Sequence, residues 1–195
     1  MIELRPLSLE DALAVLPWRR QFRETLRTTL MKTEEEQTKW YHTEVANPES
    51  RTCYWGLWET GTRDLYTETR DLYVGYGGVE NIHWQNSNGE ISLLIRPECH
   101  GMGYGRQAVM LFLEEAFLRM GLHSVNGECY RCGPVGFWQR LVSEGHYKDS
   151  TWLSARKHYE GAYHPSYYFT LFREDYEAMR DPRESRQPAD TAQEH

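Results

Sequence analysis

Residues 90–95 read Glu90-Ile-Ser-Leu-Leu-Ile95, and residues 100–105 read His100-Gly-Met-Gly103-Tyr-Gly105. The first is a short apolar run that predicts a β-strand, and Pro97 then stops strand pairing because it has no N–H to donate. After the glycines the apolar residues change to helical spacing, at Ala108, Val109, Phe112, Leu113, Ala116, Phe117 and Met120. The stretch therefore predicts a strand, a glycine-rich turn and a helix.

The glycine-rich turn leaves several backbone N–H groups without partners at the start of a helix. The helix dipole adds partial positive charge there, so the turn suits an anion such as a phosphate or pyrophosphate. Gly101, Gly103 and Gly105 allow close approach of the backbone, and Arg106 adds a full charge. Neither Gly-x-x-x-x-Gly-Lys-Ser/Thr nor Gly-x-Gly-x-x-Gly is present. A tight connection that binds nothing is the alternative interpretation.

The turn resembles the acetyl-CoA loop of the GNAT acetyltransferase superfamily, whose pattern is Gln/Arg-x-x-Gly-x-Gly/Ala. His100 stands at the Gln/Arg position. The resemblance extends over most of residues 1–176 and implies an α/β (α+β) fold with a central, mostly antiparallel mixed sheet and helices on both faces. It also implies acetyl-CoA as cofactor. The residues it assigns to cofactor binding are Leu94, Ile95, His100, Gly101, Met102, Gly103, Tyr104, Gly105 and Arg106.

Two further stretches narrow the resemblance. Gly121-Leu-His123 and Tyr159-Glu-Gly-Ala-Tyr-His164 look like the subgroup that contains ribosomal-protein N-terminal acetyltransferases. The N-terminal half looks like the amino-sugar N-acetyltransferases of that subgroup, which implies a nucleotide-linked amino sugar as acceptor. The substrate-binding residues would then be Trp18, Arg19 and Arg23. As an alternative, the arginines at 19, 20, 23 and 27 form a solvated helix face.

Length and charge limit the number of domains, the binding partners and the cellular location that we expect. A chain of 195 residues suits one domain, expected over residues 1–180, followed by a polar tail at 181–195 that we expect to be disordered. The net charge of −7 disfavours nucleic-acid binding. No apolar run is long enough to span a membrane and the N-terminus does not read as a signal peptide, so we expect a cytoplasmic protein. The resemblance also allows a homodimer.

Periodicity and capping residues predict the other elements. Strands are expected at 2–5, 54–58, 74–84 and 124–131, and a final hairpin at 152–157 and 167–173. Helices are expected from Leu9 past Pro17, over 18–30, over 34–45 and over 137–143. Thr62-Arg-Asp-Leu-Tyr66 recurs as Thr69-Arg-Asp-Leu-Tyr73, which we interpret as a local duplication in a hairpin loop.

The four cysteines raise the question of metal or redox chemistry. Cys129 and Cys132 have the Cys-x-x-Cys spacing of zinc and redox sites. A second such pair is missing from the sequence, and no histidine pair follows Cys132 at the distance typical of a zinc finger, so a zinc site lacks ligands. We therefore expect reduced cysteines and no metal.

The reaction implied by the resemblance requires an amine lone pair, and hence a base. An amine with a pKa near 10.4 is neutral in only about one molecule in 2,500 at pH 7. Glu90 is the first candidate base, because it opens the strand that leads into the glycine-rich turn and resembles a strand carboxylate of some GNAT enzymes. Glu80, within the preceding strand, is the second candidate, and His83 is the third.

The leaving thiolate requires an acid. GNAT enzymes often place a Tyr in the helix after the fifth strand, but Trp138 stands nearest that position here. An indole cannot supply the proton, so Tyr130 and Tyr147 are the candidate acids. The leading prediction is an acetyl-CoA-dependent N-acetyltransferase that acts on a small primary amine. The alternatives are a protein N-terminal acetyltransferase, a non-catalytic acyl-CoA-binding module and, more distantly, an acetyltransferase of nucleic-acid bases.

Overall fold

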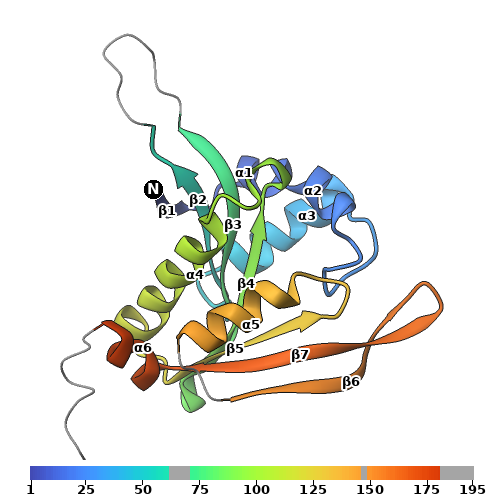
Figure 1. Ribbon diagram of the computed structural model, residues 1–195. Coiled ribbons are helices and arrows are strands. Elements are labelled where there is room, and N and C mark those ends of the chain that lie inside the picture. Colours follow the sequence, from blue (N-terminus) through green and yellow to red (C-terminus); the bar gives the residue numbers. More distant parts are fainter. Residues whose placement is uncertain (62–70, 146–148, 181–195) are drawn as a thin grey trace, which may run out of the picture.

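The computed structural model describes residues 1–61, 71–145 and 149–180 (Figure 1). The predicted tail, Tyr147 and most of the duplicated segment lie outside these residues. A seven-stranded sheet in the order β1-β2-β3-β4-β5-β7-β6 forms the centre of the described chain. Its strands are β1 (Ile2–Pro6), β2 (Cys53–Glu59), β3 (Leu72–His83), β4 (Asn88–Ile95), β5 (Ser124–Tyr130), β6 (Asp149–Tyr159) and β7 (Ala162–Phe172).

Neighbouring strands run antiparallel except β4 and β5, which are parallel. The chain crosses from β4 to β5 through the long helix α4 (Tyr104–Glu114) and a turn of π-helix (Glu115–Arg119). Strand, glycine-rich turn and helix follow one another as predicted. The mixed sheet with helices confirms the predicted fold class.

Helices cover both faces of the sheet (Figure 1). α4, α5 (Val135–Glu144) and α6 (Arg173–Arg180) bury one face in a large core centred on residues such as Phe112, Phe117 and Phe169. α1 (Leu9–Ala14), α2 (Leu16–Gln21) and α3 (Glu34–Trp40) cover the other face over a smaller core that contains Val15, Tyr76 and Leu94. None of the described helices is long and apolar enough to cross a membrane.

Local sequence explains where the helices begin. Ser8 and Thr33 each accept a hydrogen bond from a first-turn amide, and the acidic residues Asp11 and Glu36 complete a capping box at each helix, as their spacing predicts.

Close packing of the strands requires glycine at two places. A Cβ at Gly77 would lie 2.3 Å from the carbonyl oxygen of Ser92, and one at Gly127 would lie 2.1 Å from the Phe169 ring.

Two predicted boundaries were wrong. The helix expected over 18–30 ends at Gln21. Beyond this end the chain does not continue as a helix, because Thr25, Thr28 and Thr29 are poor helix formers and the carbonyls of residues 24 and 26 accept hydrogen bonds from the ammonium of Lys157. The final hairpin turns tightly at Glu160 and Gly161, with φ of 49° and 76°, so its strands are longer than expected. Helix α6 was not predicted.

Candidate active site

The parallel strands β4 and β5 pair at only three positions. Asn88 pairs with Ser124, Gly89 with Val125 and Glu90 with Asn126. Beyond Glu90 the two strands diverge, β4 toward the start of α4 and β5 toward α5 (Figure 1). Their facing edges therefore carry backbone N–H and C=O groups that the sheet does not pair. An extended molecule with amide groups of its own can lie between them, as the arm of coenzyme A requires.

The turn that follows β4 presents backbone amides at the N-terminus of α4. Gly101 and Gly103 have φ of 79° and 82°, a left-handed conformation that glycine adopts without strain, and an added Cβ would meet no atom within 4 Å at either position. Within the described chain, the amides of residues 101–106 have no hydrogen-bond partner. Free amides, the helix dipole and open space together fit the diphosphate of acetyl-CoA.

The side chains of this turn are directed elsewhere. His100 stacks on Phe22 with ring centroids 5.0 Å apart, and its Nε2 lies 3.0 Å from the carbonyl oxygen of Ile95. Arg106 forms an ion pair with Glu144 of α5. The backbone of the turn, rather than the side chains of His100 and Arg106, is therefore available to an anion.

The remaining predicted cofactor residues differ in exposure. Leu94 is buried in the core beneath α1. Tyr104 is also buried, and its hydrogen bond to Glu59, followed by burial, raises the pKa of its hydroxyl. Met102 is 61% exposed beside the free amides.

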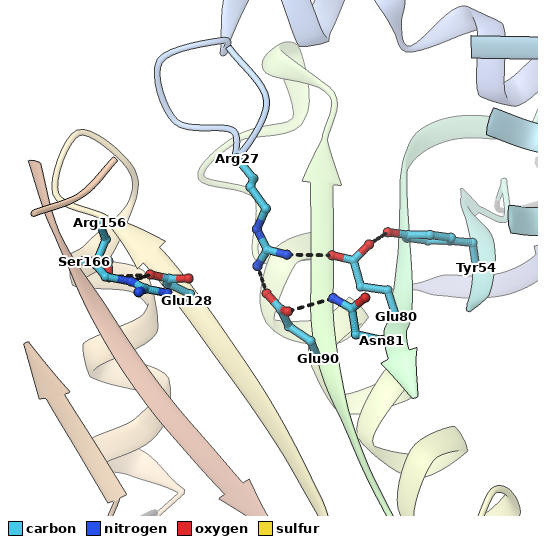
Figure 2. A network of polar contacts seen from close by, with 8 residues as sticks. All are labelled: Arg27, Tyr54, Glu80, Asn81, Glu90, Glu128, Arg156 and Ser166. Carbon is cyan, nitrogen blue, oxygen red and sulfur yellow. Dashed lines mark hydrogen bonds and ion pairs between the residues drawn. The ribbon is translucent and has the colours of Figure 1, made fainter. Parts of the chain in front are cut away.

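Glu80 and Glu90 lie opposite each other on β3 and β4, and Arg27 bridges them (Figure 2). The guanidinium of Arg27 pairs closely with Glu90 and lies 4.0 Å from Glu80. Tyr54 donates a hydrogen bond to Glu80. Burial, then the charge of Glu80, raises the pKa of Tyr54 well above its usual value, so this hydroxyl keeps its proton.

A bulge in β3 adds one more contact to Glu90. The register of β3 and β4 shifts between Glu80 and His83, and Asn81 within this bulge has a left-handed φ of 52°. Its side-chain amide donates a 3.0 Å hydrogen bond to Glu90 (Figure 2). Glu90 is therefore held by two donors, from Arg27 and Asn81.

A second polar group lies across the gap, on β5, β6 and β7. Glu128 accepts hydrogen bonds from Ser166 at 2.6 Å and from Arg156 at 3.0 Å (Figure 2). Burial opposes ionisation of this carboxyl, but the two hydrogen bonds outweigh it and lower the pKa of Glu128. One cavity of about 520 Å³ lies between the two groups. It is lined by Arg27, Asn81 and Glu90 of the first group, by Glu128 and Arg156 of the second, and by residues that include His83 and Tyr130.

Lys157 connects the second group to the loop that carries Arg27. Its side chain is 5% exposed, and the ammonium donates to the backbone carbonyls of Glu24 and Leu26. It also lies 4.8 Å from the centre of the Tyr130 ring. Burial lowers the pKa of Lys157. No local pattern in the sequence indicated this role.

The predicted substrate residues lie on α2 and the loop after it. Trp18 stacks on Tyr73 at 5.6 Å, and Arg19 donates a 2.9 Å hydrogen bond to the hydroxyl of Tyr76. Arg23 is exposed. Among the described residues that line the cavity, Arg27 is the only one of the four arginines at 19, 20, 23 and 27. The sequence indicated the basic cluster but not which member enters the site.

The candidate acids differ in position. Tyr130 lines the cavity beneath Lys157, whereas Tyr147 lies outside the described residues. Trp138 stacks on Phe169 at 5.0 Å and belongs to the core. The indole at the family's Tyr position is thus a packing residue.

The four cysteines are free thiols. Burial, then the neighbouring Cys132, raises the pKa of Cys129 to about 12, so it is unreactive at neutral pH. The thiol of Cys132 donates to the carbonyl of Glu24 at 2.9 Å. Among the described residues no group of His, Cys, Asp and Glu could hold a metal ion.

Three features of the site are those of an acyl-CoA-dependent transferase. They are the parallel central strands that diverge, the free amides at the start of α4, and the carboxylates near the point where the strands diverge. Residues 2–131 match the family model described as an acetyltransferase (GNAT) domain, and the chain belongs to this family. It is an acetyl-CoA-dependent N-acetyltransferase, as the sequence predicted.

Solved structures of a spermidine N-acetyltransferase from Vibrio cholerae share the fold. The complex with CoA and spermine gives a TM-score of 0.73 at 15% identity, over 90% of this chain and 97% of that one. A dodecameric structure of the enzyme gives 0.70 at 15% identity, over 92% and 98%. No curated protein matched this sequence. The ribosomal-protein and amino-sugar subgroup is not shown by these comparisons.

Proposed function

We propose that the protein transfers an acetyl group from acetyl-CoA to the primary amine of a small molecule that binds in the cavity between β4 and β5. The observation that carries the proposal is the pair of carboxylates, Glu80 and Glu90, at the point where the two strands part. An ammonium group in the cavity would meet the carboxylate of Glu90, and the carboxylate of Glu80 lies opposite it on β3. The Vibrio cholerae enzymes of the same fold act on spermidine, a small amine, which supports this acceptor class.

Glu90 is the proposed general base. Freeing the lone pair of an amine with a pKa near 10.4 costs about 4.6 kcal/mol at pH 7, against about 1.4 kcal/mol for an amine with a pKa near 8. A carboxylate within hydrogen-bond reach accepts the proton as the amine attacks, which lowers this cost. Arg27 and Asn81 fix the orientation of Glu90. Glu80 and His83 are the second and third candidates.

The amides of residues 101–106 are proposed to bind the cofactor's diphosphate, and the open edges of β4 and β5 its arm. Acetyl-CoA supplies an acetyl group activated as a thioester. Tyr130, which lines the cavity, is the proposed donor of a proton to the departing thiolate.

Three acceptor or function classes compete with this assignment. A nucleotide-linked amino sugar was expected to contact Trp18, Arg19 and Arg23, and the first two of these instead contact tyrosines of β3. A protein N-terminus is the second alternative. The third, a non-catalytic module, would account for the packing of Trp138 at the usual Tyr position. Self-association as a homodimer is a separate prediction, measurable by light scattering.

The deciding experiment measures release of CoA with acetyl-CoA and a panel of amines: small monoamines, polyamines, amino sugars and N-terminal peptides. We expect turnover with at least one small amine. Turnover with peptides only would reassign the acceptor. Binding of acetyl-CoA by calorimetry without turnover across the panel would favour the non-catalytic module.

A further inference from the structure

Two arginines line the cavity together with the carboxylates. Arg27 extends from the loop between α2 and α3 and is half exposed while it bridges Glu80 and Glu90. Arg156 on β6 is also half exposed, and it binds Glu128 through Nε alone. Its two terminal nitrogens have no hydrogen-bond partner within the described residues. Guanidinium groups with unused donors that face a cavity suit an anionic ligand group.

The loop that carries Arg27 is anchored close to the cavity. The ammonium of Lys157 donates to the carbonyls of Glu24 and Leu26, and the thiol of Cys132 donates to the carbonyl of Glu24. The backbone immediately before Arg27 is thus fixed to β6 and to the turn after β5. Only the side chain of Arg27 needs to move for its guanidinium to change partners.

An incoming ammonium group and Arg27 compete for the same carboxylate. When the ammonium of an acceptor binds Glu90, the guanidinium of Arg27 loses its closest partner. An acceptor that brings an anionic group gives Arg27 a new partner. The ion pair of Arg27 with Glu90 is then replaced by two, one between the ammonium and Glu90 and one between the anionic group and Arg27. An acceptor that brings a second ammonium leaves Arg27 beside a like charge, which disfavours binding.

We infer that the natural acceptor carries an anionic group, a carboxylate or a phosphate, a few bonds from its amine, and that Arg27 and Arg156 bind this group. The inference rests on the proposed function and names the substrate class of the same cavity. It makes Arg27 a specificity residue, because this side chain favours acidic amines over polyamines. The mixed lining of two glutamates, Glu90 and Glu128, and two arginines suits an amine with both charges better than a polycation.

The test uses four acceptors of similar length: 4-aminobutanoate, 3-aminopropylphosphonate, butylamine and 1,4-diaminobutane. Initial rates with acetyl-CoA give kcat/KM for each on the full chain. We expect the wild-type enzyme to favour one of the two acidic amines over the diamine. The carboxylate and phosphonate compounds distinguish the two kinds of anion. Arg27→Gln should lower the preference for acidic amine over diamine about tenfold or more, as expected for loss of one charge-assisted hydrogen bond.

Arg20→Gln is the matched control, since it removes an equal charge from an exposed position on α2 and should leave the ratio unchanged. Arg156→Gln should lower kcat/KM for the acidic amines more than for butylamine. A wild-type preference for the diamine, or a ratio that Arg27→Gln leaves unchanged, would overturn this inference while the N-acetyltransferase assignment stands. If the protein bound acetyl-CoA but acetylated no amine of any class, both the proposed function and this inference would be overturned.

Discussion

Asn81 donates a 3.0 Å hydrogen bond to the carboxylate of Glu90 from a backbone held in the left-handed region, with φ of 52°. Such a conformation costs a residue other than glycine about 1 kcal/mol or more, and asparagine tolerates it better than most. The bulge in β3 therefore holds a strained residue where its amide reaches the proposed base. Strain of this kind is common where side chains are aimed at a site.

Replacing Asn81 by glycine separates the hydrogen bond from the strain. Asn81→Gly removes the donor and relaxes the backbone, so we expect kcat to fall about tenfold, since a hydrogen bond to a charged group is worth about 1.5 kcal/mol. The melting temperature should not fall. Asn81→Ala should show the same loss of kcat with a lower melting temperature. Full activity of Asn81→Gly would show that this contact has no catalytic role.

Glu90→Gln should lower kcat at pH 7 by about 100-fold, the usual contribution of a general base. The dissociation constant for acetyl-CoA, measured by calorimetry, should stay unchanged because the carboxylate is not part of the anion-binding turn. Activity of the variant should recover as the pH approaches the pKa of the acceptor amine, since solvent then supplies the neutral form. A larger loss in Glu80→Gln than in Glu90→Gln would move the base to Glu80.

Gly103→Leu should weaken binding of acetyl-CoA about tenfold or more. Leucine strains the left-handed backbone at φ of 82° by about 1–2 kcal/mol and places a side chain among the free amides. The fold should survive, because a Cβ there meets no neighbouring atom. Gly136→Leu in α5 is the control, where a Cβ would lie 3.8 Å from Arg140, an ordinary contact. Equal affinities of the two variants would contradict our placement of the diphosphate.

Tyr130→Phe keeps the ring beneath the ammonium of Lys157 and removes only the hydroxyl. If this hydroxyl protonates the thiolate, kcat should fall by about 100-fold with the melting temperature unchanged. Single-turnover kinetics would separate chemistry from product release. An unchanged rate would assign the proton to Tyr147 or to water.

Glu128 predicts a pH dependence of stability. Its hydrogen bonds to Ser166 and Arg156 outweigh burial and lower its pKa in the folded state, so folding favours the ionised form. The resulting stabilisation is complete above the unfolded-state pKa and is lost as the pH falls through the folded-state pKa. Urea unfolding of wild type and Glu128→Gln should therefore differ at pH 7, and the difference should shrink as the pH falls through the folded-state pKa of Glu128. A difference that does not change with pH would mean that packing, rather than charge, is responsible.

The fold was largely predictable because its signals are local. Capping residues at Ser8 and Thr33, the strand at Glu90 and the glycines at 101–105 each act within a few positions of the chain. The pairing of Glu80 with Glu90 also follows from a short hairpin. Both carboxylates could therefore be named as candidates before the structure was known.

The rest of the site depends on contacts that no local pattern encodes. Arg27 and Glu90 are 63 positions apart, and Lys157 and Glu24 are 133 apart. Four arginines at 19, 20, 23 and 27 look alike in the sequence. Arg27 is the one that reaches the cavity, and it lies in a loop whose carbonyls at residues 24 and 26 bind a lysine from the other half of the chain. Arg156 lies in a strand that carried no signal of function.

The short pairing of β4 with β5 has a thermodynamic consequence. A ligand whose amides complete the open edges acts as an added strand and binds only the folded chain. At a hundredfold excess over its dissociation constant, such a ligand raises the free energy of unfolding by about 2.7 kcal/mol. The survival of this enzyme against proteolysis in a cell should therefore follow the supply of its own acetyl donor.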